Sequence, residues 1–352
     1  MTRLHFSRVA MGGALLAAVA AAPVAASAND AVANFYGNKT ITVVVGSGMG
    51  GSYGLYGQMT AQHLGRHIPG NPKMVVQSMP GGGGMKALSY VYNAAPKDGS
   101  FIIGGHQEVL QETVLNPNIK FDVRKFQWLG RYMDVDYLGF ASGQSGVKTL
   151  EDARKRQVVS GATGARATNA MASLAFNRFA GTNIKVVPGY KSTGEMFVAM
   201  ERNEIEFITA TWVVIKALHT PKIQSGQLVP IFALSLERVP DYPNVPAITE
   251  FGNDAAEKKF LKFWAAGGMI GRSVFAPPGV PADRMDALRT AFDTMVKSPD
   301  FLKDAEKRKA SLNPMGGKEL EAKIAEVMNL TEDDVQSARK IYGELLKSAS
   351  AK

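Results

Sequence analysis

Residues 40–54 read Thr-Ile-Thr-Val-Val-Val-Gly-Ser-Gly-Met-Gly-Gly-Ser-Tyr-Gly, an apolar β-branched run followed at once by a glycine loop. The run predicts a buried strand over 40–45, since Asn38-Lys39 precedes it and Gly46 ends it. Leu55, Met59 and Leu64 then recur at near-helical spacing, and Pro69-Gly70 marks the stop. The stretch therefore predicts a strand, a glycine turn and a helix.

The same order of elements continues along the chain. Residues 73–77 predict a second strand, the glycine loop 80–84 follows it, a helix passes through Leu88, Val91 and Tyr92, and residues 101–103 predict a third strand. A strand, a crossover helix and a further strand are typical of a parallel sheet covered by helices. The sequence therefore predicts an α/β fold.

The pattern starts again near Tyr137, which indicates a second α/β lobe over 138–250. Its predicted strands are 137–140, 157–160, 184–187 and 206–209, the last ending near Trp212, and its predicted helices are 150–156, 168–179 and one through Phe197 and Met200. Apolar helical faces recur after residue 280, at Met285 to Met295, Leu320 to Val327 and Val335 to Leu345. We expect these helices to return to the first lobe, which would then comprise 29–137 and 251–352.

The N-terminus has the features of a cleavable export signal. Arg3 and Arg8 precede an apolar run from Val9 to Val24, and Ala26-Ser27-Ala28 provides a small-x-small cleavage site. We expect residues 1–28 to be removed and the mature chain to be soluble in the periplasm.

The chain has no Cys, which excludes a lipid-anchored Cys, disulfides and Cys nucleophiles. The net charge is +9, but no block of five Lys or Arg occurs, so nucleic acid is not an expected partner.

Two motifs in the first glycine loop suggest enzymes. Gly46-Ser-Gly-Met-Gly-Gly51 contains the dinucleotide-binding GxGxxG, but that fingerprint also needs an acid about twenty residues on, and none lies between Asp30 and Asp98. Residues 50–54 match the GxSxG nucleophile elbow with Ser52, although His219 is the last His of the chain and lacks a suitable context. An exported serine hydrolase stays open as an alternative, and no cofactor is expected.

A metal site is not expected. His63 and His67 have the i, i+4 spacing that can bind a metal, but the surrounding segment supplies no carboxylate to complete the site. Two exposed histidines on the polar face of the first helix are the simpler interpretation.

Four glycine loops follow predicted strands, at 46–54, 80–84, 161–168 and 188–194, two in each lobe. Backbone N–H groups of such loops at helix N-termini bind anions, and open α/β sheets bind ligands at the carboxyl ends of their strands. The sequence therefore predicts a cleft that closes on a small acid. The segment 31–97 contains no Asp or Glu, which favours a carboxylate without an amino group, although Glu195 of the second lobe could contradict this.

Several short motifs, in this order, carry a family resemblance. They are Gly50-Gly51, Met79-Pro-Gly-Gly-Gly-Gly84, Pro96-Lys-Asp-Gly99, Val187-Pro-Gly-Tyr-Lys191, Leu236-Glu-Arg-Val-Pro240, Asn244-Val-Pro-Ala-Ile-Thr-Glu250 and Ala276-Pro-Pro-Gly-Val-Pro281. The chain resembles the Bug-type solute-binding proteins of the tripartite tricarboxylate transporter system over nearly the whole mature length. The resemblance implies a two-lobe, flytrap-like periplasmic-binding-protein fold of type II, with mixed sheets and two crossover strands.

The resemblance also implies where a ligand is held. In the first lobe the contacts would be Gly50, Gly51, Ser52, Tyr53, Gly81, Gly82, Gly83 and Gly84, and in the second Thr163, Gly164, Ala165, Thr168, Tyr190, Lys191, Thr211 and Trp212. Tyr53, Tyr190 and Trp212 are candidate pocket walls, and Thr163, Thr168 and Lys191 are candidate carboxylate donors.

The chain departs from the family at two positions. The family has an acid and then an Arg shortly after the paired glycines, where this chain has Gly54 and Gly57. Residues 52–56 also resemble the TAXI-type binding proteins of tripartite ATP-independent transporters.

The function expected from the sequence is capture of a small carboxylate, either a di- or tricarboxylate or an aromatic acid. A monomeric, non-enzymatic binding protein would deliver it to an integral membrane permease. A receptor that presents its ligand-bound form to a sensor is a further alternative.

Overall fold

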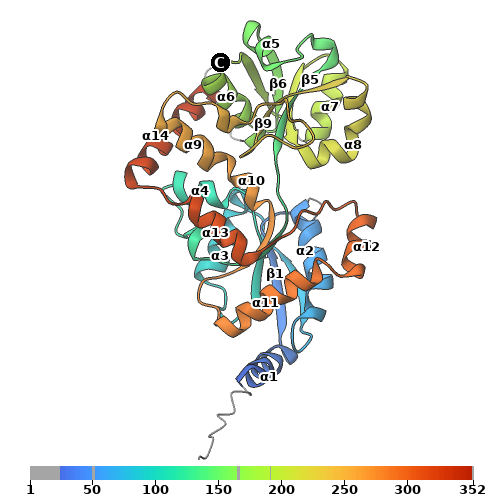
Figure 1. Ribbon diagram of the computed structural model, residues 1–352, viewed down its shortest axis with the longest axis vertical. Coiled ribbons are helices and arrows are strands. Elements are labelled where there is room, and N and C mark those ends of the chain that lie inside the picture. The colour runs from blue at the N-terminus through green and yellow to red at the C-terminus, as the bar shows by residue number, and fades with distance from the viewer. Residues whose placement is uncertain (1–23, 50–51, 165–166, 191, 351–352) are drawn as a thin grey trace, which may run out of the picture.

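The structure, a computed structural model, describes residues 24–49, 52–164, 167–190 and 192–350, and it has two lobes, each built on one sheet (Figure 1). The first sheet has the order β11-β4-β10-β3-β1-β2. Its strands are β1 Thr40–Val45, β2 Lys73–Ser78, β3 Phe101–Gly104, β4 Gln127–Met133, β10 Arg272–Ala276 and β11 Met315–Gly316. The second sheet has the order β7-β6-β8-β5-β9. Its strands are β5 Tyr137–Ser142, β6 Val158–Ala162, β7 Ile184–Pro188, β8 Phe207–Thr211 and β9 Leu228–Leu234.

Helices cover both sheets, and the α/β fold with two lobes is confirmed. The helices around the first sheet are α1 Val24–Gly37, α2 Ser52–His63, α3 Met85–Asn93, α4 Val109–Leu115, α10 Gly267–Ile270, α11 Ala282–Met295, α12 Pro299–Lys307 and α13 Gly317–Val327. Those around the second sheet are α5 Leu150–Lys155, α6 Thr168–Ala180, α7 Thr193–Glu201, α8 Trp212–Gln224, α9 Ala255–Ala265 and α14 Glu332–Ser350. Within the described part of the chain, no helix is long and apolar enough to cross a bilayer.

Both sheets are mixed, and within each sheet the carboxyl ends of the parallel strands lie at one edge. In the first sheet β1 lies between β2 and β3 and is parallel to both, whereas β10 runs antiparallel to β3 and β4. In the second sheet β6 is parallel to β7 and β8, whereas β5 runs antiparallel to β8 and β9. The chain passes from one sheet to the other at residues 134–136, and it returns through α9 and α10 into β10.

All seven strands expected from the sequence are present, with ends shifted by a few residues. One expectation is wrong in detail: Trp212 does not end a strand but opens α8, since β8 stops at Thr211. The sequence analysis missed the edge strands β9 and β11, and it missed β4 and β10, which lie side by side within the first sheet. Neither β4 nor β10 alternates between apolar and polar residues, because both are buried along nearly their whole length, Arg131 included.

The C-terminal helices divide between the two lobes. Phe292 of α11 joins the core on one face of the first sheet, and Leu320 of α13 joins the core on the other. In contrast, Ala338, Ile341 and Leu345 of α14 pack with α6 and α9 in the core of the second sheet, and Figure 1 shows these three helices together. Helices of the chain after residue 250 thus cover both sheets. An apolar helical stripe predicts burial but does not identify the partner.

His63 differs from its expected exposure. It is buried, its ring packs edge-on against Phe301, and its Nε2 lies 2.9 Å from Oδ2 of Asp304 on α12. The expectation of an exposed His63 is therefore wrong, because α12 folds back over α2.

The first turn of α2 lies so close to the preceding loop that Gly54 has no room for a side chain. A Cβ there would lie 2.3 Å from the carbonyl oxygen of Met49, and a Cβ on Gly57 would lie 2.5 Å from Cγ2 of Val45. Close packing of α2 onto β1 and its loop therefore requires glycine at both positions.

We expect Gly54→Ala to destabilise the protein by about 1–3 kcal/mol, because the clash is with backbone atoms that cannot turn aside. This outweighs the gain of up to about 1 kcal/mol that Ala brings to a helix. Urea unfolding measures the change. Gly48→Ala is the matched control, because a Cβ at Gly48 meets no atom within 4 Å. Equal stability of the two variants would contradict the packing argument.

Candidate functional site

A cleft of about 530 Å³ lies between the lobes, where the carboxyl ends of both sets of parallel strands meet. The first lobe contributes the ends of β1, β2 and β3 with the residues that follow them. The second contributes the ends of β6 and β8 with the first residues of α6 and α7. Its lining comprises Gly46, Ser47, Tyr53, Gly81, Gly82, Gly83, Gly84, Met85, His106, Glu108, Glu112, Tyr137, Thr163, Ala167, Thr168, Asn169, Thr193, Thr209, Ala210 and Thr211.

The loop after β2 needs glycine at four successive positions. Gly81, Gly82, Gly83 and Gly84 all have positive φ, between 55° and 143°, a conformation that other residues rarely adopt. At Gly84 the neighbouring imidazole of His106 also excludes a side chain, because a Cβ would lie 2.6 Å from its Nε2. The result is a loop whose backbone faces the cleft without side chains over it, as anion-binding loops require.

His106 connects the two glycine loops of the first lobe. A Cβ on Gly46 would lie 2.7 Å from Nε2 of His106, so the ring fills the space between Gly46 and Gly84. His106 is only 5% exposed, and its Nε2 has no hydrogen-bond partner among the described residues. A buried polar nitrogen without a partner costs free energy, which a hydrogen bond to a bound molecule would recover.

Burial, together with the charge of Arg272, lowers the pKa of His106 to about 4. The ring is therefore neutral near pH 7, and one of its nitrogens carries a proton that it can donate.

Tyr53 is held between two flat groups. Its ring stacks on the imidazole of His106 at 4.0 Å between centroids, and the guanidinium carbon of Arg272 lies 4.1 Å from its ring centroid. Its hydroxyl donates to Oε2 of Glu108 at 3.3 Å and accepts from the backbone N–H of Gln107 at 3.4 Å. Burial and the nearby Glu108 raise the pKa of the Tyr53 hydroxyl, which keeps it neutral as a donor.

The second lobe presents hydroxyl groups to the cleft. Thr163 and Asn169 contact each other through side-chain hydrogen bonds of 3.4–3.5 Å, whereas the hydroxyl of Thr209 is buried and pairs with Ser173 at 3.1 Å. Thr168 opens α6 and Thr193 opens α7, so two helix N-termini face the cleft, and in α7 the N–H of Glu195 is capped by the hydroxyl of Ser192. Hydroxyls and helix N-termini both favour an anionic ligand.

A chain of hydrogen bonds joins the two lobes and reaches the cleft lining at Tyr137 and Thr168. Nε of Arg272 donates to the hydroxyl of Ser52 at 2.9 Å, and its Nη1 donates to Oε1 of Gln107 at 3.0 Å. The amide of Gln107 then donates to the hydroxyl of Tyr137 at 3.0 Å, and Tyr137 hydrogen-bonds Thr168. The start of α2 is thus linked to the start of α6.

The structure brings together part of the predicted ligand set. Tyr53, the loop 81–84, Thr163, Thr168 and Thr211 line this one cleft. Gly50, Gly51, Ala165 and Lys191 lie outside the described residues.

Four predicted contacts are placed away from the lining. Ser52 faces Arg272, and Gly164 has an open position where a Cβ would meet no atom within 4 Å. Tyr190 packs against the second-lobe core beside Gly161. The ring of Trp212 is buried near Phe140, and its Nε1 donates to Oδ2 of Asp241 at 2.9 Å. Trp212 and Tyr190 are therefore not walls of this cleft.

The sequence analysis missed the segment after β3. His106, Glu108 and Glu112 line the cleft from there, together with residues outside the predicted loops such as Tyr137 and Thr209. A signal was available, since residues 101–103 were expected to form a strand parallel to the first two. The carboxyl end of such a strand lies at the same edge of the sheet.

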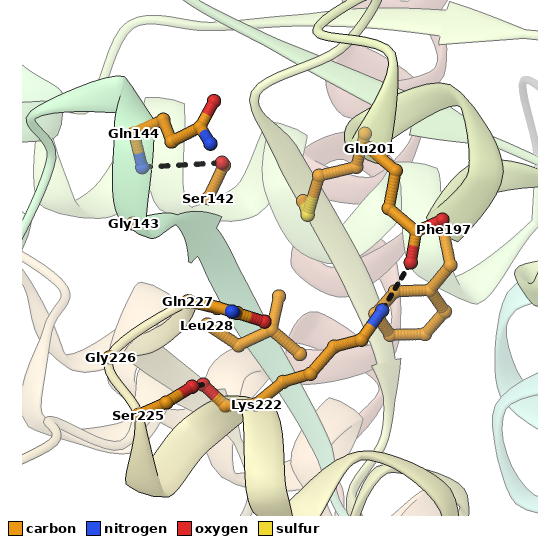
Figure 2. A pocket seen from close by; sticks show the side chains of 11 residues that line it. Ser142, Gly143, Gln144, Phe197, Glu201, Lys222, Ser225, Gly226, Gln227 and Leu228 are labelled. Atoms are coloured by element: carbon orange, nitrogen blue, oxygen red, sulfur yellow. Dashed lines mark hydrogen bonds and ion pairs between the residues drawn. The ribbon is translucent and has the colours of Figure 1, made fainter.

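A second hollow of about 410 Å³ lies on the second lobe, away from the cleft. Figure 2 shows Lys222 reaching across it to pair with Glu201, with Phe197 beside them. It is formed at the end of β5 and the start of β9, among residues 142–144, 197–201 and 222–228. No parallel strand ends there, so it lacks the features that make the interlobe cleft receptive to anions.

Two lobes that present glycine loops, hydroxyls and helix N-termini to a common cleft define a solute-binding protein. Residues 64–341 match the tripartite tricarboxylate transporter family receptor, and the chain belongs to this family. It is therefore a solute-binding protein of the kind that the motifs resembled. A UPF0065 protein of Bordetella bronchiseptica is 22% identical over 310 residues, which cover 84% of this chain and 83% of that protein.

Solved structures share the fold. A TctC solute-binding protein from Polaromonas aligns with a TM-score of 0.66 at 17% identity, covering 88% of this chain and 99% of that one. MatC from Rhodopseudomonas palustris with bound malate aligns with a TM-score of 0.55 at 20% identity, covering 88% and 99%. A second R. palustris protein, with adipate, gives a TM-score of 0.56 at 19% identity, covering 89% and 98%.

The buried neutral His106 predicts that stability falls in acid. The folded state holds the ring with a pKa of about 4, against an ordinary value of 6.5, so the unfolded chain takes up a proton first as the pH falls. We expect about 2–3 kcal/mol of unfolding free energy to be lost between pH 7 and pH 4.5 through this group.

Urea unfolding of wild type and His106→Phe at both pH values measures this loss as the difference between the two proteins. His219→Phe is the comparison variant: burial lowers the pKa of His219 too, but this ring stacks on Phe197 away from the cleft, so the variant separates the contribution of His106 from that of a histidine elsewhere. An unchanged pH dependence in His106→Phe would contradict the neutral ring.

Proposed function

We propose that this protein captures a small carboxylate in the interlobe cleft and delivers it, unchanged, to a membrane permease of the tripartite tricarboxylate transporter. It acts as an exported monomer in the periplasm. The observation that carries the proposal is the meeting of both first-lobe glycine loops, the unpaired Nε2 of His106 and the second-lobe hydroxyls around one cleft. Each of these groups can donate a hydrogen bond to a carboxylate.

The bound molecules of two relatives of the same fold agree with this ligand class. Malate and adipate, found in the R. palustris proteins, are both dicarboxylates. At about 20% identity these structures establish a common fold, and the ligand class of this chain rests on its own cleft.

The contacts of Ser52 support a binding protein over a serine hydrolase. Its hydroxyl accepts a hydrogen bond from Nε of Arg272 at 2.9 Å, and no histidine among the described residues hydrogen-bonds it. A serine nucleophile needs a general base within hydrogen-bond reach, and a permanently charged guanidinium cannot take its proton.

We expect isothermal titration calorimetry with a panel of small organic acids to detect binding, and Thr168→Val to weaken it by about 10- to 100-fold. The variant removes a hydroxyl next to the charged ligand while keeping the shape of the side chain. Thr220→Val is the matched control, since Thr220 lies on α8 and its hydroxyl donates to the carbonyl of Lys216. The absence of binding by any acid, or ester hydrolysis that Ser52→Ala abolishes, would overturn the proposal.

Export predicts that the mature chain begins at Asn29. Residues 1–23 lie outside the described part of the chain, and α1 runs from Val24 across the expected cleavage point to Gly37. Intact-mass measurement on protein recovered from a periplasmic extract tests the cleavage, with Ala28→Trp as a variant that signal peptidase should leave uncut. Full-length protein retained inside the cell would count against export.

A further inference from the structure

We propose that the solute bound by this protein carries a cationic nitrogen as well as its carboxylate, and that Glu108 and Glu112 receive the cation. This inference rests on the proposed function and names the class of solute within it. It is carried by the position of the two acids in the cleft and by the lack of a matching cation among the described lining residues.

The two acids lie one helical turn apart at the deep end of the cleft. Glu108 directly precedes α4 and Glu112 lies in its first turn. Both line the main cleft and also a smaller space of about 100 Å³ that continues from it toward α9 and α10. Tyr137 and Thr168 also line both spaces, so the two acids lie where the main cleft and the smaller space meet.

Both acids accept hydrogen bonds and keep further acceptor capacity. Oε2 of Glu108 accepts from Tyr53 at 3.3 Å, and Oε2 of Glu112 accepts from Nδ2 of Asn116 at 2.8 Å. The carboxylate of Glu108 also receives a hydrogen bond from its own backbone. Because an ionised carboxylate can accept about four hydrogen bonds, these contacts leave capacity for a bond from a bound molecule.

The described lining of both spaces contains Glu108 and Glu112 but no Lys or Arg. Among the described residues, Arg272 acts on the charge of Glu108 without forming an ion pair with it. Its guanidinium stacks on the Tyr53 ring and donates its described hydrogen bonds to Ser52, Gln107 and the carbonyl of Gly271. Burial raises the pKa of Glu108 in spite of the attraction of Arg272. Two carboxylates one helical turn apart repel each other when both are charged, and a bound cation relieves this repulsion.

The remaining lining favours the opposite charge, so the cleft has two distinct poles. The loop 81–84, His106 and the second-lobe threonines can donate to a carboxylate, whereas Glu108 and Glu112 can accept from an ammonium. A zwitterion satisfies both poles, whereas a plain dicarboxylate that reached Glu108 would place a third negative charge beside two others.

This reverses an expectation from the sequence. The absence of acids over 31–97 favoured a solute without an amino group, but the acids of this lobe enter the cleft from α4, just beyond that segment.

Matched ligand pairs test the inference by calorimetry: succinate against aspartate, glutarate against glutamate, and glutarate against 5-aminovalerate. In wild type we expect at least one ammonium-bearing member to bind about 10-fold or more tightly than its partner. In Glu108→Gln we expect that member to lose about 10- to 100-fold in affinity, while its partner changes by less than about 3-fold. Glu112→Gln should act in the same direction, and it also serves if Glu108→Gln does not fold.

Glu204→Gln is the matched control, because Glu204 is exposed on the second lobe and pairs with Arg202. Thermal unfolding of each variant verifies that it is folded. The inference is overturned if the plain dicarboxylates bind as tightly as their ammonium-bearing partners. It is also overturned if Glu108→Gln leaves the preference unchanged, or if it strengthens the binding of plain dicarboxylates alone.

The test separates failure of this inference from failure of the proposed function. Tight binding of plain dicarboxylates that Thr168→Val weakens would leave the proposed function intact and reject only the cation. Binding by neither member of any pair would count against both.

Discussion

The His106 ring lies between Gly46 and Gly84, and the first-lobe side of the cleft depends on this contact. Its imidazole occupies the space that a side chain on either glycine would need, so the loops after β1 and β2 keep bare backbones at a fixed separation. Tyr53 stacks on the other side of this ring and is held in turn by Arg272. The loops after β1 and β2, the start of α2 and the strand β10 thereby meet at one pair of stacked rings. Removing the imidazole would loosen both loops and the start of α2 together.

The same group of residues also links the two lobes to each other. Arg272 holds Gln107, and Gln107 donates to Tyr137 directly after the first crossing of the chain. Tyr137 in turn contacts Thr168 at the start of α6. A ligand that bonds to Thr168 and to the glycine loops therefore acts on both ends of one hydrogen-bonded path. Closure of two lobes on a ligand needs contacts that differ between the open and the closed state, and a ligand held by both lobes would add such contacts.

Hydrogen-bond donors and acidic groups lie in different parts of the cleft, so the cleft can orient a bound molecule. Backbone N–H groups, hydroxyls and a neutral imidazole gather at the glycine loops and helix N-termini, while two carboxylates gather at α4. Glycine loops recognise a carboxylate and distinguish little of what is attached to it. The side chains on α4 can supply that distinction, because accepting groups at a fixed position reject a ligand that leaves them unpaired.

The sequence by itself determined the α/β class, the order of the strands around each glycine loop and the place of those loops at the carboxyl ends of strands. These are local properties: β-branched runs favour buried strands, and a loop such as 81–84 needs glycine because its φ angles are positive. The family motifs are local too, and they indicated the correct family.

Only the tertiary structure decided which side chains meet at that edge. His106 and Glu108 come from the segment after β3 and Arg272 comes from β10, and nothing in their local sequence marks them as neighbours of Tyr53. The sequence also did not indicate which lobe α14 packs against, because an apolar stripe on a helix can be buried against either lobe. Trp212 was expected in the cleft but is buried near Phe140, since the chain turns into α8 one residue after β8 ends. Local preferences fix the elements and their order, whereas contacts between distant residues depend on how the whole chain packs.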